Sequence, residues 1–131
     1  IIKNLSPLDC KVLKYIMESP YQEIGCYEFR VGAIGESSYH VSFPYVTEMT
    51  LGTAEEIATS IENLSRNNLI FPKDFCYRDD NKYSIIRDTP FFKDISAYFS
   101  ANPEGNELRY KMSIQSTSLG KTFYDICATP L

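Results

Sequence analysis

The residue types that most often carry catalytic chemistry are few in this chain, and no spacing among them marks a site. The single histidine, His40, lies in an alternating run typical of a strand. A histidine-based triad needs a nucleophile and an orienting carboxylate nearby in space, and no signature marks either partner. The short motifs of serine hydrolases, zinc proteases and phosphate-binding loops are absent from the sequence. The sequence therefore favours a domain that is not an enzyme, and we assign no catalytic residue.

The sequence also lacks a clear signature of a metal site. The four cysteines stand at positions 10, 26, 76 and 127, so no pair has the close spacing that zinc sites and redox couples use. The run Asp79-Asp80-Asn81 offers oxygen ligands, but it lacks the glycine and the distal glutamate of a calcium loop, and a turn explains it better. We expect no metal and no cofactor. We expect free thiols in a reducing, cytoplasmic setting, with Cys10 and Cys127 on buried helix faces.

Composition sets further bounds on the function. A length of 131 residues with 44% hydrophobic residues suits one globular domain, residues 1–131, with its own core. The net charge of −4 does not favour bulk attraction to nucleic acid or to anionic membranes, and no apolar run reaches about 18 residues. We therefore expect no membrane contact. The chain begins with Ile1 rather than methionine, which suggests a C-terminal fragment of a longer protein.

Four stretches have the periodicity and caps of helices. Ser6 and Pro7 begin a helix that stops at Pro20, and Thr53 with Glu56 forms a capping box for a helix over residues 54–66. Asn67 and Asn68 can adopt the left-handed conformation that ends this helix. Residues 89–99 form a third helix. The fourth covers residues 118–127.

The last helix follows directly from an alternating strand. Thr117 is its predicted cap, and Gly120 has no side chain to keep a neighbouring element away. We expect four residues on its buried side: Leu119, Phe123, Ile126 and Cys127.

The strands alternate between apolar and polar residues. Residues 27–31 and 39–43 predict one hairpin, residues 75–85 a second hairpin with its turn at Asp79–Asn81, and residues 108–115 a half-buried strand. Residues 69–71 form a short extended run. Residues 44–52 fit a short helix or a loop equally well.

This order of elements resembles a winged-helix domain. The helix over residues 54–66 would be the one that could enter a DNA groove, and the hairpin at 75–85 with the strand 108–115 would form the wing. We therefore predict an α+β, winged-helix-like domain with an added β-hairpin at residues 26–43 and an added helix at residues 89–99.

Three segments narrow the resemblance. "LSPLDCKVLKYI", "IENLSRNNLI" and "IQSTSLGKTFYDIC" are similar to segments of the Abi-alpha family, bacterial proteins named after abortive-infection systems against phage. The matching residues are packing residues, so the resemblance carries over no catalytic residue. It implies a role in phage defence and a further N-terminal region.

Eight polar residues are candidates for contact with DNA or with a partner: Thr59, Glu62, Asn63, Arg66, Arg78, Lys82, Arg109 and Lys111. Asn63 and Arg66 could read base edges, and the other cations could form a positive wing. However, the helix over residues 54–66 carries three carboxylates against one guanidinium, and a solvated face with an ordinary Glu62–Arg66 pair explains its charges more simply.

The favoured function is a non-catalytic interaction or adaptor domain, acting through a protein partner or self-association. The alternative is a winged-helix transcriptional regulator that binds duplex DNA, and a third class is a hydrolase with its active residues upstream. An exposed tyrosine patch would favour a protein contact, although half-buried strand tyrosines are equally compatible. Its members would be Tyr21, Tyr27, Tyr39 and Tyr45.

Overall fold

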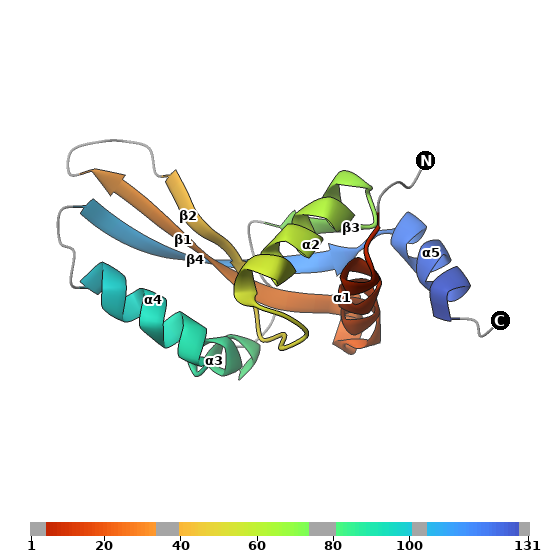
Figure 1. Cartoon of the computed structure of the whole chain (residues 1–131), viewed down its shortest axis with the longest axis horizontal. Coiled ribbons are helices and arrows are strands. Elements are labelled where there is room, and N and C mark those ends of the chain that lie inside the picture. Colours follow the sequence, from red (N-terminus) through yellow and green to blue (C-terminus); the bar gives the residue numbers. More distant parts are fainter. Residues whose placement is uncertain (1–4, 34–39, 74–80, 101–104, 129–131) are drawn as a thin grey trace.

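A computed structural model describes residues 5–33, 40–73, 81–100 and 105–128. Its helices and strands confirm a mixed α+β fold. In chain order the elements are α1 (Pro7–Glu18), the 3₁₀ turn η1 (Pro20–Gln22), β1 (Glu23–Ala33), β2 (His40–Val46), α2 (Ala54–Arg66), β3 (Ile70–Lys73), α3 (Asn81–Arg87), α4 (Pro90–Ser100), β4 (Gly105–Ser116) and α5 (Ser118–Ala128) (Figure 1).

One antiparallel sheet organises the chain, with the strand order β2-β1-β4-β3. β1 pairs with β4 over the whole length of β1, from Glu23 opposite Gln115 to Ala33 opposite Gly105. The two edge strands each contain a proline, Pro44 in β2 and Pro72 in β3. Proline lacks the N–H that a further strand would bind, so both edges are poor templates for sheet extension.

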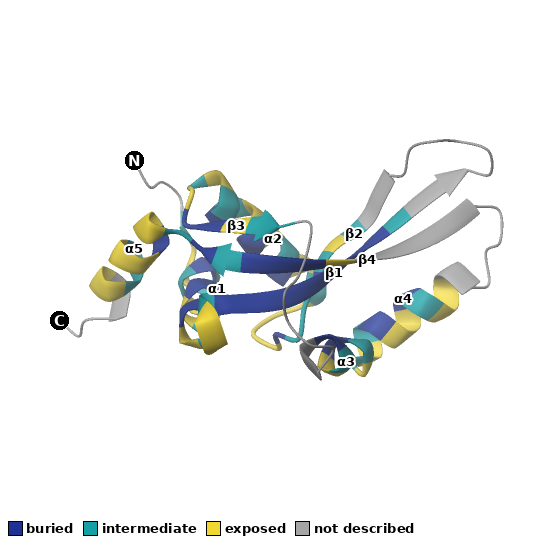
Figure 2. Cartoon of the chain, turned by 180° about the vertical axis from the view of Figure 1, so that it is seen from behind, coloured by how far each residue is buried: buried dark blue, intermediate teal, exposed yellow. Residues whose placement is uncertain are grey.

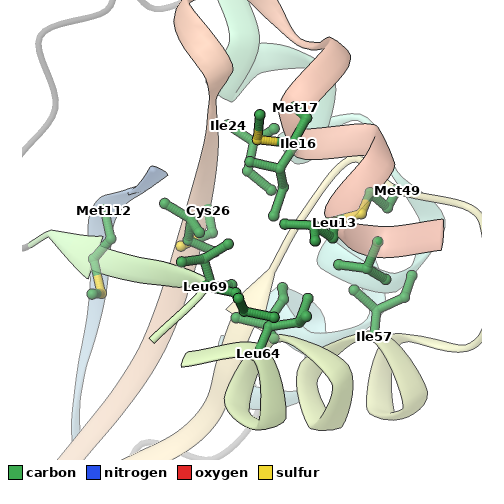
Figure 3. Packing of buried hydrophobic residues seen from close by; sticks show 14 residues of the cluster. Leu13, Ile16, Met17, Ile24, Cys26, Met49, Ile57, Leu64, Leu69 and Met112 are labelled. Carbon is green, nitrogen blue, oxygen red and sulfur yellow. The ribbon is translucent and has the colours of Figure 1, made fainter. Parts of the chain in front are cut away.

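The larger core lies on one face of the sheet, beneath α1 and α2. Ile24 and Cys26 of β1 point into it, and neither side chain is exposed to solvent. Leu13 and Ile16 of α1 meet Leu64 and other apolar residues of α2 there (Figure 3). The stripe of apolar residues along each helix therefore packs as the helical period predicts.

The smaller core lies on the opposite face, where α3 and α4 pack against the sheet (Figure 2). Tyr27 and Phe29 alternate with the residues of the larger core along β1, so they point to this side. The Tyr83 ring lies fully buried here, and its hydroxyl donates to the Met112 carbonyl at 2.7 Å. A Cβ atom at Gly25 would approach the Tyr83 ring to 3.1 Å, so glycine leaves room for the ring.

Local signals predicted the capped helices correctly. Ser6 and Asp9 form a capping box at α1, and Thr53 and Glu56 form the predicted one at α2. Asn68 has φ 59°, so the left-handed residue that ends α2 is confirmed. The helix predicted over 89–99 is α4, and the strand predicted over 108–115 lies within β4.

The hairpin predicted over residues 75–85 is wrong in its second half, because residues 81–87 form α3. Tyr83 and Ile86 point into the smaller core while Ile85 is half exposed, and this three-residue spacing belongs to a helix. Phe75 and Tyr77 lie outside the described residues. The ambiguous stretch 44–52 continues β2 as far as Val46 and then bends without forming a helix.

The winged-helix detail is not confirmed. The added hairpin exists as β1–β2 and the added helix as α4. Between β3 and β4, however, the described residues form α3 and α4, where a wing would have a hairpin (Figure 1).

The predicted buried side of α5 is only partly right: Phe123 contacts the larger core as predicted, and the side chain of Cys127 is not described. Leu119 is 47% exposed and Ile126 is 68% exposed, whereas Gly120 is buried. The helix is rotated so that Phe123 and Tyr124 contact the larger core. The cause is the close approach of Gly120 to the backbone at Leu69, which places the glycine on the inner side.

Candidate functional site

The outer face of α2 forms a polar ridge. The helix buries Ile57, Ser60, Ile61 and Leu64 against the larger core, which leaves the opposite face in solvent. We call Glu55, Thr59, Glu62 and Arg66 the α2 ridge; each is exposed. Two of the predicted contact residues at the ridge, Glu62 and Arg66, bind each other, with Arg66 Nη2 donating to Glu62 Oε1 at 2.9 Å.

Asn63 belongs to the junction between α1 and α2 and not to the ridge. Its side-chain Nδ2 donates to Asp9 Oδ2 at 2.7 Å, and the backbone N–H of Ser6 donates to the same oxygen at 2.9 Å. Burial alone would raise the pKa of Asp9, but hydrogen bonds from Ser60, Ser6 and Asn63 outweigh it, and the pKa is lowered. The Asn63 amide, a candidate for reading base edges, thus donates to a buried carboxylate instead.

Two hollows flank the α2 ridge, and Glu55, Thr59 and Glu62 line both of them. The hollow toward α1 is broad, about 790 Å³, and Asp9, Asn63 and Arg66 contribute to its lining. The hollow on the other side is smaller, about 300 Å³, and lies between α2, β2 and the start of α4. We call it the Phe91 hollow. Its lining consists of Phe43, Pro44, Val46, Ala54, Glu55, Ala58, Thr59, Glu62 and Phe91.

An irregularity in β2 gives the Phe91 hollow its apolar wall. Phe43 pairs with Phe29 and Val46 pairs with Tyr27, so two residues of β2 face one residue of β1. This is the pattern of a β-bulge, and Tyr45 within it has φ 56°. The bulge places Phe43 and Val46 on one side, although a regular strand would point them to opposite faces. Phe43 then meets Phe91 of α4 edge to face, with ring centroids 6.2 Å apart.

A third hollow, of about 330 Å³, adjoins the Phe91 hollow and shares Val46, Ala54 and Phe91 with it. Tyr45, Met49 and Ile57 add further apolar surface to its wall. Phe91 therefore stands between two small apolar hollows that lie side by side next to α2. No local pattern predicts this role, because the spacing of Phe91 is that of an ordinary core residue of α4 and the hollows form only when β2 and α2 are in place.

Of the residues in the predicted basic patch, only Lys111 has a described side chain, and it does not lie on the α2 ridge. Lys111 lies on the other face of the sheet, with its Nζ 5.3 Å from the centroid of the Tyr83 ring. Arg109 stands in β4 opposite Phe29, and Lys82 stands in the first turn of α3; their side chains are outside the described part of the structure. Arg78 lies outside the described residues. Among the described side chains, the candidates thus divide between two faces of the sheet.

The tyrosines predicted as a patch are also dispersed. Tyr21 is 88% exposed, Tyr27 is buried in the smaller core, and Tyr45 is half-buried. Tyr39 is not among the described residues. The three described tyrosines therefore do not form one exposed surface.

Among the described residues, the acidic, histidine and cysteine side chains do not cluster as metal ligands do. Within the described ranges, no group of three histidine, cysteine or acidic side chains could hold a metal ion. Burial, and secondarily the charge of Glu28, raises the pKa of the Cys26 thiol, which keeps it protonated and unreactive. Cys10, predicted as buried, is half-buried, and the side chain of Cys127 is not described. His40 begins β2, as predicted for a strand residue.

No helix in the described ranges has the length and apolar character needed to cross a membrane.

The architecture defines the chain as a mixed α+β domain on a four-stranded antiparallel sheet, with an acidic helix face beside an apolar hollow. Residues 1–127 match the family described as abortive infection alpha, and the chain belongs to that family. The resemblance seen in its packing segments is thereby confirmed.

Among solved structures, one of the uncharacterized protein from the hydrocarbon-degrading marine bacterium Alcanivorax borkumensis SK2 aligns with the chain at 13% identity. The alignment covers 96% of this chain and 88% of that one, with a TM-score of 0.47. No curated protein matches the chain.

Proposed function

We propose that this chain is a non-catalytic interaction domain of a protein that acts in abortive infection. Membership of the abortive infection alpha family supports the biological role. One structural observation carries the molecular role: the α2 ridge adjoins the Phe91 hollow, so an exposed polar edge and an open apolar surface lie side by side. Protein interfaces combine these features, with an apolar centre and a polar rim.

The charges near α2 favour a protein partner over duplex DNA. The helix carries Glu55, Glu56 and Glu62 against the single cation Arg66, which already pairs with Glu62. DNA binding draws most of its affinity from cations placed against phosphates, and carboxylates in that position would repel them. Asn63, the other proposed base reader, is held by Asp9.

Binding to duplex DNA, the alternative function, is tested by fluorescence anisotropy with a labelled random-sequence DNA duplex at about 50 and 200 mM salt. We expect no more than weak binding at either salt concentration. Tight binding at low salt that falls steeply at the higher concentration would establish a DNA-binding protein and overturn the proposal.

The biological role is tested by phage plaque counts on cells that produce the whole encoded protein. Ala58→Trp would fill the Phe91 hollow, and we expect it to weaken protection by about tenfold or more, as loss of a central interface contact does. The matched control, Ala97→Trp, places the same side chain at an exposed position of α4 outside the hollow. Equal protection by both variants would contradict a role for this surface.

A further inference from the structure

We infer that the Phe91 hollow binds a short cationic, amphipathic segment of a partner protein. Two apolar side chains of the segment would enter the two adjoining hollows, and a lysine or arginine would face Glu55 and Glu62. This inference rests on the proposed interaction function and names the chemistry of the partner.

The shape of the surface indicates two apolar anchors. The hollows of about 300 and 330 Å³ lie next to each other around Phe91 and share Val46 and Ala54. Each volume suits one or two side chains rather than a folded domain. Peptide segments that bind in apolar grooves place successive anchors in this way, at i and i+3 or i+4 of a helix.

The small residues along α2 keep this surface open. Ala54 lies between the two hollows, and Ala58 follows one turn later along the wall of the Phe91 hollow. Both are half-buried, so a larger side chain at either position would occupy the space that an anchor needs. The apolar floor is supplied by Phe43 and Phe91, whose rings contact each other and are themselves only partly buried.

The negative charge at the edge of the Phe91 hollow, which we call the rim, favours a partner segment of positive charge. Glu55 and Glu62 line the Phe91 hollow from the α2 ridge, and no lysine or arginine is among its lining residues, all of which are described. Glu62 pairs with Arg66 outside the hollow, so Glu55 supplies the net negative charge of the rim. Both carboxylates are exposed, so they are hydrated in the free protein. A cation on the incoming segment would be attracted to this rim, whereas an acidic segment of the same apolar pattern would be repelled.

The test uses a pair of capped synthetic peptides of about 14 residues, two heptads each. In one, leucines recur at helical spacing and lysines fill the other positions. In the second, glutamates replace the lysines. Binding to the isotope-labelled protein is followed by amide chemical shifts in NMR. We expect the lysine peptide to bind at least about tenfold more tightly than the glutamate peptide, with the largest shifts at Ala58, Thr59 and Phe91.

Three variants separate this site from general attraction to an acidic protein. Ala58→Trp should abolish the shifts at the hollow, and Glu55→Lys should weaken the lysine peptide by about threefold to tenfold. Asp125→Lys makes the same charge change at an exposed position of α5, and Ala97→Trp adds the same ring outside the hollow; neither should alter binding. Glu55→Lys changes only an exposed side chain, so it keeps the test valid if Ala58→Trp does not fold.

Equal binding of both peptides, shifts centred elsewhere, or equal weakening by Glu55→Lys and Asp125→Lys would overturn the inference. A dimer of the protein alone that Ala58→Trp dissociates would also overturn it, because the occupant would then be a second copy. If the peptide tests fail but Ala58→Trp still weakens phage protection, the partner is not a cationic segment. The proposed interaction function would then still hold.

Discussion

Gly120 of α5 lies against the backbone carbonyl of Leu69 so closely that a Cβ atom on the glycine would stand 2.1 Å from the Leu69 oxygen. Leu69 directly precedes β3, and its carbonyl also accepts a hydrogen bond from the Thr117 N–H at 3.1 Å. The first turn of α5 is therefore fixed to the segment that follows α2. The period change from strand to helix near residue 117 marks this junction.

Replacing Gly120 by alanine should destabilise the fold by roughly 1–3 kcal/mol, because backbone atoms must move to admit one methyl group. Gly52→Ala is a matched control: its Cβ would meet side chains rather than backbone, with Glu56 Oε1 3.3 Å and Leu8 Cδ2 3.5 Å away. Urea denaturation of both variants measures the free energy of unfolding. Equal stability of Gly120→Ala and Gly52→Ala would show that the close approach to Leu69 does not constrain residue 120.

Thr117→Ala should cost on the order of 1 kcal/mol of stability, as the loss of an N-cap does. The Thr117 hydroxyl accepts from the Gly120 N–H at 2.9 Å and donates to the Asn68 carbonyl at 2.6 Å, so it caps α5 and ties it to the end of α2. Thr122→Ala removes an exposed hydroxyl that bonds only within α5. In thermal denaturation, the melting temperature of Thr117→Ala should be clearly lower than that of Thr122→Ala. The reverse order would contradict the capping role.

Asp9 should contribute to acid unfolding. Its folded-state pKa is lowered, so its stabilisation is complete above its unfolded pKa, about 3.9, and is lost as the pH falls below that value toward the folded pKa. Asp9→Asn should lower stability at neutral pH and flatten the loss of stability between about pH 5 and pH 2.

The measurement is urea denaturation at a series of pH values, with the exposed Asp88→Asn as a control for the loss of one carboxylate. An Asp9→Asn variant with the full acid sensitivity of the wild type would refute the hydrogen-bonded role of Asp9.

Cys26 should resist alkylation in the folded protein. Its side chain is fully buried, and its raised pKa leaves almost no thiolate near neutral pH. Mass spectrometry after iodoacetamide treatment should find Cys26 unmodified in buffer and modified in urea. Rapid labelling of Cys26 in buffer alone would contradict the burial of this part of β1.

Local signals sufficed for the parts of the fold that local chemistry determines. Capping residues and apolar stripes predicted α1, α2 and α4, and clean alternation predicted the main part of β4. The segment around Tyr83 was ambiguous, because Tyr83 and Ile85 fit a strand while Tyr83 and Ile86 fit a helix, and only packing under β1 decides between them. Short apolar runs of this kind cannot be assigned from period alone.

The candidate site could be predicted only in part. The exposed face of α2 follows from its amphipathic pattern, so Thr59, Glu62 and Arg66 were placed correctly in solvent. Asn63 looked equally exposed, but its contact with Asp9 joins residues 54 positions apart. The Phe91 hollow depends on a bulge in β2 and on the position of α4, and neither has a local signature.

The central claim is that the surface around α2 contacts protein rather than nucleic acid. The most direct measurement places a photo-crosslinking amino acid at position 59, on the α2 ridge, in the whole encoded protein in phage-infected cells, with position 97 on α4 as the control. We predict discrete crosslinked products from position 59 that resist nuclease and disappear with protease, and few from position 97. Products that nuclease removes, or equal yields from both positions, would contradict the account.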